Sequence, residues 1–596
     1  MKNIKKVLSL FSPRERKQAF LLLILLLIMA ILDTIGVASI LPFIAVLTNP
    51  ELIETNFILN SMFQFSNKFG VENSQHFLFA LGILVFVFLV LSITFKAFTT
   101  YVQLKFVQMR EYSIGKRLME GYLRQPYSWF LNRHSAELGK NILSEAGTVV
   151  GGFLKPLIDV IARLMITIAL ISLIIIVDPK LALVIGFTLG GAYIIIFYLM
   201  RSFLNQIGNK RLKHNEMRFK SVSEAFSASK EVKVGGLEEI YIKWFSHSAQ
   251  IYARASASSA VVSQLPRFFL EVIAFGGILL IILYMMRQSD NFYNVLPVIS
   301  LYVFAGYRLL PALQQIYAAF TTLTYAGPTI DKLAEDFKNL KKFNFNQDQG
   351  VLSFNKTITL KNIDYEYPNS SRTVLKNISL SIPAKSSVGI VGATGSGKTT
   401  TVDIILGLLE AQKGTLEVDG KIITKQNSRS WQRSIGYVPQ HIYLSDDTVA
   451  ANIAFGVDPQ DISQENVEKA SKIANLHEFI IDELPKKYQT TIGERGVRLS
   501  GGQRQRIGIA RALYHKPQVL ILDEATSALD NQTEKAVMNE VNNLNRNITT
   551  IIIAHRLSTV KKCDQIYFLN KGQLESKGTF EELIKINESF RANANN

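Results

Sequence analysis

Long apolar runs alternate with charged segments along residues 1–330, and short strand-like and helix-like segments alternate after residue 350. A helix needs roughly 20 mainly apolar residues to cross a bilayer. Six runs of this kind lie at 19–47, 77–98, 154–177, 181–200, 267–286 and 293–325. The pattern predicts an all-α transmembrane domain of six helices in residues 1–330.

The polar connections between these runs predict an orientation. Lys and Arg are concentrated near the N-terminus and in 99–153 and 201–265, as the positive-inside rule expects of cytoplasmic segments. Both connections are too long for simple loops, so we expect the membrane helices to continue into the cytoplasm. Each should reverse direction, near 126–139 and near 228–240, in short helices that would contact the domain that follows.

The segment at 49–70 follows the first apolar run and has its own pattern. Its apolar residues fall at roughly helical spacing and include Leu52, Ile53, Phe57, Ile58, Met62 and Phe63. This spacing predicts a short amphipathic helix. The helix would lie on the outer membrane face, or it would be an ordinary loop helix packed on its neighbours.

A second domain is expected at 351–596, after a linker at 331–350. Its first strand-like stretch is TITLKNIDYEY, and strands and helices alternate from there. Such alternation predicts an α/β domain with a parallel sheet covered by helices.

Composition and charge agree with a membrane half joined to a soluble half. Hydrophobic residues make up 48% of the chain and charged residues 19%, and the formal net charge is +17. The basic residues are not interleaved with aromatic ones along one face, so we expect no nucleic-acid partner. Cys563 is the single cysteine, which rules out an intrachain disulfide. The first apolar run is too long for a cleavable signal peptide.

The strongest chemical motif follows the strand-like SSVGIV and precedes the helix-like TTVDIILGLL. It consists of Gly392, Ala393, Thr394, Gly395, Ser396, Gly397, Lys398 and Thr399, with Thr400 next. This is a phosphate-binding loop in its required strand–loop–helix context, where backbone N–H groups and the helix N-terminus surround phosphate oxygens. Lys398 is expected to reach the β- and γ-phosphates, and the Thr399 hydroxyl to bind Mg²⁺.

A second motif, QVLILDEATSALD, ends an apolar strand with two adjacent acids. Asp523 is expected to bind the metal ion and Glu524 to act on the attacking water. The alternative is a strand that simply ends in acidic turn residues, which is less favoured beside the phosphate-binding loop.

Between these motifs lies Leu499-Ser500-Gly501-Gly502-Gln503, followed by RQRIGIARAL. This segment resembles the signature sequence of ATP-binding cassette (ABC) transporters, and the resemblance extends over 355–585 with the motifs in the expected order. It implies ATP and Mg²⁺ as cofactors. It also implies that Tyr367 stacks on adenine and that Gln440 contacts Mg²⁺. His555 would lie near the γ-phosphate, and Ser527 to Asp530 would form a dimer contact.

The resemblance further implies that Ser500, Gly501, Gly502 and Gln503 bind the γ-phosphate held by a second subunit. One membrane domain and one cassette per chain then predict a domain-intertwined homodimer with two shared ATP sites. ATP binding would bring the cassettes together and hydrolysis would let them part. The segments near 126–139 and 228–240 would carry this motion to the membrane helices, which gives alternating access.

Six spans fused to a cassette resemble a type IV ABC exporter. DTIGVASILPFIAVL, the amphipathic segment and FAGYRLLPALQQI together resemble bacterial lipid-linked oligosaccharide flippases. This resemblance implies ATP-driven export of a lipid-linked pyrophosphate oligosaccharide across the bacterial inner membrane, with both termini and the cassette in the cytoplasm. The alternatives are an exporter of phospholipid, hydrophobic drug or peptide, and, disfavoured by the apolar runs, a soluble ABC ATPase of chromosome or repair machinery.

Charged residues within the apolar runs are candidates for a cargo site, because such residues normally face a cavity or a partner. They are Asp33, Arg163, Arg267 and Arg308. Arginines suit a pyrophosphate group, which guanidinium binds in a bidentate manner. Lys155, Asp159 and Arg163 are spaced four residues apart, so they could instead form an ion-pair ladder on a cytoplasmic helix extension.

Overall fold

The computed structural model describes Lys6 and residues 11–68, 70–71, 73–177, 179, 187, 190–288, 296–340, 350–368, 372–493, 496–526, 528–544, 547–554 and 556–594. The description leaves out some side chains within these helices, including that of Arg308. The chain forms two compact units. The first comprises Met1–Gln125 and Arg133–Lys342, and the second comprises Pro126–Asn132 and Phe343–Asn596.

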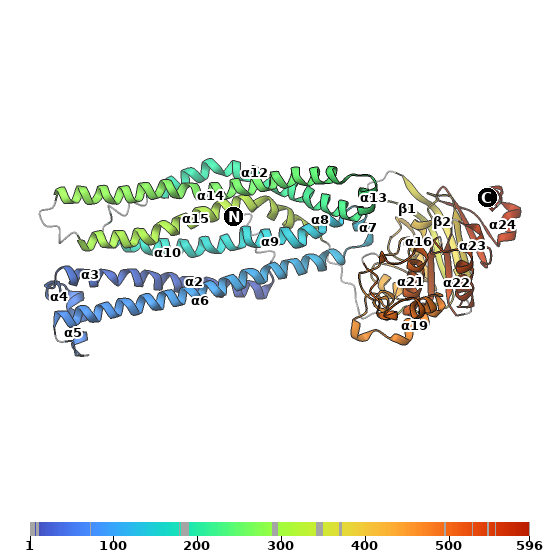
Figure 1. Cartoon of the computed structure of the whole chain (residues 1–596), viewed down its shortest axis with the longest axis horizontal. Coiled ribbons are helices and arrows are strands. Elements are labelled where there is room, and N and C mark those ends of the chain that lie inside the picture. The colour runs from blue at the N-terminus through green and yellow to red at the C-terminus, as the bar shows by residue number, and fades with distance from the viewer. Residues whose placement is uncertain are drawn as a thin grey trace. The chain divides into compact units, whose positions relative to one another are not determined.

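Long helices make up the first unit (Figure 1). They are α2 (Pro13–Ala38), α3 (Ile40–Thr48), α6 (Ser74–Leu123), α10 (Lys155–Val177), α12 (Gly191–Ser227), α14 (Glu238–Gln288) and α15 (Leu296–Asn339). Helix α2 packs against α6, α12 against α14, and α10 against α15. Among the described residues, Pro13–Gly36 and part of α6 are long and apolar enough to cross a membrane. The first half of the predicted span at 181–200 lies largely outside the described residues, and its second half begins α12.

Several helices extend far beyond membrane length, as the sequence predicts. Helix α6 has 50 residues and α14 has 51. The expected reversals are the short helices α7 (Tyr127–Phe130) and α13 (Ser229–Val234). Helix α15 continues to Asn339, past residue 330, so the exact boundary of the membrane domain stays a prediction.

The helical segment between α7 and α10 is not uniform. It consists of α8 (Ser135–Lys140), η1 (Asn141–Glu145), α9 (Ala146–Val149) and η2 (Val150–Leu154). Both η1 and η2 are π-helical turns. Such turns are rare and occur often at functional sites.

The amphipathic segment folds as α4 (Leu52–Thr55) and α5 (Phe57–Asn67). The Asn56 side chain begins α5 by accepting hydrogen bonds from the backbone N–H groups of Ile58 and Leu59. Ile53 and Leu59 pack into a small core with Val46, Phe77 and Leu81. Phe57, Ile58 and Phe65 are exposed. The helix therefore packs on its neighbours with one face and presents apolar side chains on the other, which keeps both predicted interpretations open.

The second unit contains two sheets (Figure 1). One is antiparallel in the order β2-β1-β4-β5, made of β1 (Thr357–Glu366), β2 (Thr373–Pro383), β4 (Lys413–Val418) and β5 (Lys421–Ile422). The other has the order β10-β9-β3-β8-β7-β6. Its strands are β3 (Ser387–Gly392), β6 (Ile435–Val438), β7 (Val519–Asp523), β8 (Thr549–Ile553), β9 (Gln565–Asn570) and β10 (Gln573–Gly578). The sequence predicts the parallel part of this second sheet but not the separate antiparallel sheet.

Helices surround these sheets. They are α16 (Lys398–Ile405), α17 (Ser428–Gln432), α18 (Val449–Ile453), α19 (Gln464–Ile473), α20 (His477–Asp482), α21 (Gly501–Tyr514), α22 (Asn531–Leu544), α23 (Leu557–Val560), α24 (Phe580–Ile586) and α25 (Glu588–Ala594), with the short turns η5 (Pro459–Asp461) and η6 (Lys487–Gln489). Strands β7 and β8 are buried along their whole length. Continuous apolar strands of this kind are typical of parallel sheets covered on both faces.

Candidate functional site

Three parallel strands bring the nucleotide motifs to one edge of the sheet. Strand β3 pairs with β8, and β8 pairs with β7, so that Ile390 lies opposite Ile553 and Ile553 opposite Asp523. Parallel strands end at the same side, and ligands of such sheets bind beyond these carboxyl ends. The phosphate-binding loop after β3 and the acids at the end of β7 therefore belong to one site.

The loop between β3 and α16 depends on its glycines. Gly392, Gly395 and Gly397 have φ angles of 155°, 79° and 99°. A Cβ on Gly392 would lie 2.1 Å from the carbonyl oxygen of Leu569, so any larger residue would have to displace backbone. No atom lies within 4 Å of a Cβ built on Gly395. The loop is thus held against the sheet at its start and is open at its middle.

The inner wall of the loop fits phosphate. The buried Lys398 amine donates hydrogen bonds to the carbonyl oxygens of Gly392 (2.8 Å) and Ala393 (3.1 Å). Burial lowers the pKa of Lys398, and the charges of Glu524 and Asp523 oppose this effect. The Ser396 hydroxyl is buried and has no hydrogen-bond partner in the described part of the chain. An ammonium and an unpaired hydroxyl beside an open loop are groups that a phosphate would satisfy.

The first turn of α16 connects this loop to the predicted adenine platform. Thr394 and Thr399 are exposed, and Thr400 is buried. The hydroxyl groups of Thr400 and Tyr367 lie 3.0 Å apart and share a hydrogen bond. This bond holds the Tyr367 ring beside the helix that starts with Lys398.

The two acids have different surroundings. Asp523 is buried and accepts a hydrogen bond from the Tyr437 hydroxyl at 3.4 Å. Glu524 has a φ of 50°, and its backbone N–H donates to the Ile553 carbonyl at 3.0 Å. The Gln440 amide donates to the Glu524 carboxylate at 2.8 Å. Glu524 is therefore oriented by two elements that come from separate parts of the sequence.

The predicted metal ligands have the chemistry that Mg²⁺ prefers. Thr399 offers a hydroxyl, Gln440 an amide oxygen and Asp523 a carboxylate, and Mg²⁺ takes oxygen ligands together with substrate phosphates. Burial and the neighbouring Asp523 raise the pKa of Asp403 to about 6. This raised pKa indicates that negative charge is crowded here, which a bound cation would relieve.

The signature segment begins α21. The Ser500 hydroxyl accepts from the Gln503 backbone N–H at 3.2 Å, and the Gln503 side chain accepts from the Ser500 N–H at 2.8 Å. This reciprocal arrangement is a capping box. Each of Gly501 and Gly502 would bring a Cβ within 3.2 Å of Ala528 or Leu529. The signature thus packs against the segment that follows the two acids, and its contact with a second subunit's phosphate stays a prediction.

One residue that the sequence analysis missed links two parts of this site. The Glu534 carboxylate accepts from the hydroxyl groups of Thr526 (3.0 Å) and Thr559 (2.9 Å). Its other oxygen lies 3.9 Å from the Arg556 guanidinium. Glu534 is one acid in a charged helix, and no local pattern distinguishes it. His555 and Ser527 lie outside the described residues.

Two of the charged residues predicted for a cargo site, Asp33 and Arg267, form ion pairs with residues outside that set. Asp33 on α2 is buried, accepts from the Ser92 hydroxyl at 3.2 Å and lies 3.8 Å from the Lys96 amine. Asp159 on α10 accepts from Gln103 at 2.6 Å, which ties α10 to α6. Arg163, one turn further along α10, is half-buried.

The other two candidates are Arg267 and Arg308. Arg267 forms a 2.6 Å ion pair with Glu271, one turn later in α14, and the Arg267 side chain is half exposed. The side chain of Arg308 lies outside the description. The contribution of Asp33, Arg163, Arg267 and Arg308 to a cargo site therefore stays a prediction.

Comparisons with known proteins agree with the fold. The family model described as "ABC transporter" matches residues 375–527, and the model described as "ABC transporter transmembrane region" matches residues 41–309. ABC transporter B family member 6 of Dictyostelium discoideum is 32% identical over 65% of this chain. The chain spans only 60% of that relative's length.

Two further matches cover more of the sequence or of the structure. The ATP-dependent lipid A-core flippase of Albidiferax ferrireducens is 32% identical over 78% of this chain and 79% of its own length. A bacterial Atm1-family ABC exporter solved with ATP bound shares the fold with a TM-score of 0.78, at 21% identity over 97% of both chains. The expected family is thereby confirmed: the chain belongs to the ABC transporters, whose cassette is an ATPase that uses ATP with Mg²⁺ as the usual ion.

Proposed function

We propose that this chain is an ATP-driven exporter or flippase that moves an amphiphilic cargo across the bacterial inner membrane by alternating access. The observation that carries the proposal is the alignment of Lys398, Asp523 and Glu524 at one sheet edge, in a chain whose first unit contains long helices, two of which are apolar enough to cross a membrane among the described residues. Hydrolysis at this edge would supply the free energy for moving the cargo.

The residues of the site would divide the chemistry among them. Bound ATP supplies the reacting phosphoryl group, and bound Mg²⁺ neutralises its charge. Lys398 would leave the loop carbonyl oxygens and turn its amine to the phosphates. Glu524, held by Gln440, would orient a water molecule and accept its proton. The open middle of the loop at Gly395 leaves room for the phosphates to approach the backbone N–H groups.

A homodimer would complete the site. Ser500 is exposed at the N-terminus of α21, a helix of 14 residues whose positive end favours an anion. Its capping bonds stay within its own segment, so its exposed side is free to meet a phosphate held by a second copy. Helix α7 belongs to the cassette unit although the chain on both sides of it belongs to the helical unit. This placement supports the role of α7 in passing motion between the units.

The proposed mechanism of ATP hydrolysis is tested by replacing Glu524 with Gln. We expect the variant to bind ATP while its hydrolysis falls by about 100-fold or more, because the amide cannot accept the proton. Phosphate release and retained nucleotide would be measured on the same protein preparation. Glu540→Gln, an exposed acid on α22, is the control and should hydrolyse ATP normally. Normal hydrolysis by the Glu524 variant would refute the assignment of the general base.

For the cargo, we propose a lipid-linked pyrophosphate oligosaccharide. A lipid A-core flippase is among the relatives, which supports a cargo with a lipid part. The arginines predicted to lie within the membrane support a cargo with phosphate groups, because guanidinium and phosphate form bidentate pairs. The lipid tails would stay in or near the bilayer while the polar part passes among the helices.

The cargo proposal is tested in liposomes that contain a lipid-pyrophosphate oligosaccharide, a phospholipid or a hydrophobic drug. We expect only the first to stimulate ATP hydrolysis and to be translocated. Arg267→Ala should reduce this stimulation several-fold, whereas Arg254→Ala, an exposed arginine in the same helix, should not. Stimulation by the phospholipid or the drug alone would replace the proposed cargo with that class.

A further inference from the structure

The chain passes between its two units at three places, which we call passages. The carboxylate of Asp336 contacts residues of the first unit that lie near the other two passages. The passages follow Gln125, Asn132 and Lys342. Asp336 lies near the end of α15, shortly before the third passage. Tyr122 lies just before the first passage, and Arg133 is the residue directly after the second. All of these contacts lie within the first unit.

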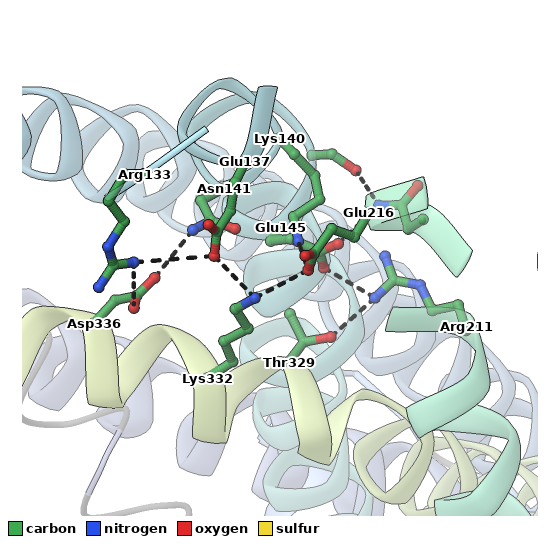
Figure 2. Close-up of polar contacts among 12 residues, drawn as sticks. Arg133, Glu137, Lys140, Asn141, Glu145, Arg211, Glu216, Thr329, Lys332 and Asp336 are labelled. Carbon is green, nitrogen blue, oxygen red and sulfur yellow. Dashed lines mark hydrogen bonds and ion pairs between the residues drawn. The ribbon is translucent and has the colours of Figure 1, made fainter. Parts of the chain in front are cut away.

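The contacts of Asp336 are specific (Figure 2). One carboxylate oxygen accepts from the Asn141 amide at 3.0 Å and from the Tyr122 hydroxyl at 3.4 Å. The other oxygen lies 3.8 Å from the Arg133 guanidinium. The Asn141 amide also donates to the Tyr122 hydroxyl at 3.2 Å, which closes the group on itself. Three chain segments therefore meet at one acidic side chain.

The site is dry. Asp336 is 8% exposed, Tyr122 3% and Asn141 1%. Burial raises the pKa of Asp336, against the effect of Arg133 and Lys332. Burial likewise raises the pKa of Tyr122. A carboxylate in such surroundings depends on these few partners, so the arrangement is rigid while it holds.

One turn before Asp336 on α15, Lys332 connects these contacts to α12 (Figure 2). Lys332 bridges Glu137 at 3.1 Å and Glu216 at 3.0 Å. The fully buried Lys140 amine also lies 3.0 Å from Glu216. Helix α12 leads into the second reversal, α13. The hydrogen bonds from both lysines lower the pKa of Glu216 although burial alone would raise it.

A second layer joins the same helices. The Arg211 guanidinium on α12 lies 3.0 Å from Glu145 and donates to the Thr329 hydroxyl at 2.9 Å. Asn215 donates to Glu145 at 2.7 Å. Glu145 ends the π turn η1, at whose start Asn141 contacts Asp336. The π turn thus contacts α15 through Asn141 and α12 through Glu145.

We infer that Asp336 is the positioning residue of a passage clamp, formed with Tyr122, Arg133, Asn141 and Lys332, which makes the three passages move as one body when the cassette moves. The inference rests on the proposed function, because it assigns the clamp to the coupling between ATP hydrolysis and the membrane helices. Without the clamp, each passage would bend separately, and motion of the cassette would be lost before it reached the helices.

The test separates hydrolysis from motion in full-length dimers. A nitroxide is attached to Ser61→Cys, an exposed position on α5, and the distance between the two labels is measured with and without ATP and vanadate. Burial raises the pKa of the native Cys563 thiol to about 11, so it should not react with the label. Asp336→Ala is compared with Glu335→Ala, an exposed acid next to it. Tyr122→Phe, which removes a single hydroxyl group, is a second and milder variant.

We expect Asp336→Ala to hydrolyse ATP within about two-fold of the wild type but to lose at least about half of the ATP-driven distance change. Tyr122→Phe should show a smaller loss of the same kind, and Glu335→Ala none. An unchanged distance response in both clamp variants would overturn the inference. So would a parallel loss of hydrolysis and motion, which indicates a purely structural role. An absent response in the wild type would instead overturn the proposed function.

Discussion

Glu524 stands in a backbone conformation that few residues other than glycine adopt. Its φ of 50° turns the chain directly after the buried end of β7, and its N–H group bonds to Ile553 on the neighbouring strand. Left-handed conformations of non-glycine residues cost free energy and cluster at functional sites. The turn aims the Glu524 carboxylate at Gln440 rather than along the strand, which is the orientation that a base acting on water would need.

Glu534 is expected to support this geometry from outside the reacting atoms. Glu534→Ala would release Thr526, two residues after Glu524, from Thr559, which follows the predicted position of the switch histidine. We expect ATP turnover to fall by about ten- to a hundred-fold with little change in the KM for ATP, because positioning is lost and binding is not. Steady-state kinetics would measure both constants.

Two further variants serve as controls for Glu534→Ala. Glu534→Gln keeps an acceptor for both hydroxyl groups and should recover much of the turnover. Glu540→Ala removes an exposed acid from the same helix and should have no effect. A KM that rises with unchanged turnover would contradict a positioning role.

Helix α15 contributes residues to both layers of polar contacts. Asp336, Lys332 and Thr329 lie at helical spacing and contact segments from α6, α8 to η1, and α12. Side chains three or four residues apart share one face of a helix. Polar residues on one face near the end of an otherwise apolar helix therefore join it to several partners at once.

The titration of Asp336 tests whether burial on α15 raises the pKa of this carboxyl group. Its folded pKa is raised by burial, so protonation stabilises the folded state, and this stabilisation is lost as the pH rises through the folded pKa. Asp336→Asn does not titrate. Relative to the wild type, its thermal unfolding midpoint should therefore be higher at about pH 8 than at about pH 5.

Several charged or titratable groups face Asp336 and could also affect how its stability contribution depends on pH. They are Arg133, Lys332, Glu137 and the Tyr122 hydroxyl. Glu216 and Glu137 raise the pKa of Lys332 against the effect of burial, so Lys332 stays protonated across this pH range and does not create the difference. A difference between variant and wild type that is the same at both pH values would show that folded Asp336 does not titrate between about pH 5 and pH 8, and it would contradict the prediction.

Within the cassette, the signature and the phosphate-binding loop pack into different hydrophobic cores. Helix α21 packs with β6, α18 and α19, whereas α16 packs with β2 and β3. A rigid cassette cannot bring Ser500 onto its own Lys398 without breaking these contacts. Two copies related by symmetry would satisfy both motifs at once.

This arrangement predicts complementation between two inactive variants. A mixed dimer of Lys398→Ala and Ser500→Ala has one doubly defective site and one intact site. If the two sites act independently, it should recover roughly half of the wild-type turnover, although each homodimer is inactive. Differently tagged chains, purified through both tags, would provide the mixed dimer. Turnover no higher than that of the homodimers would contradict shared sites.

The nucleotide chemistry and the family follow from the amino-acid sequence alone. The phosphate-binding loop, the Asp523–Glu524 pair and the signature are contiguous, because backbone groups and neighbouring side chains must meet one small ligand. Strands β1, β3 and β7 follow equally from local apolar patterns. These features needed no knowledge of distant contacts.

The contacts between residues far apart in the chain depend on how the whole chain packs. Asn141 and Asp336 are 195 residues apart, and Asp33 and Ser92 are 59 apart. The antiparallel sheet, the bridge through Glu534 and the passage clamp likewise depend on pairings between segments that carry no shared local signal. A buried charge is stabilised by whichever partner the packing brings within reach, and the packing is set by the chain as a whole.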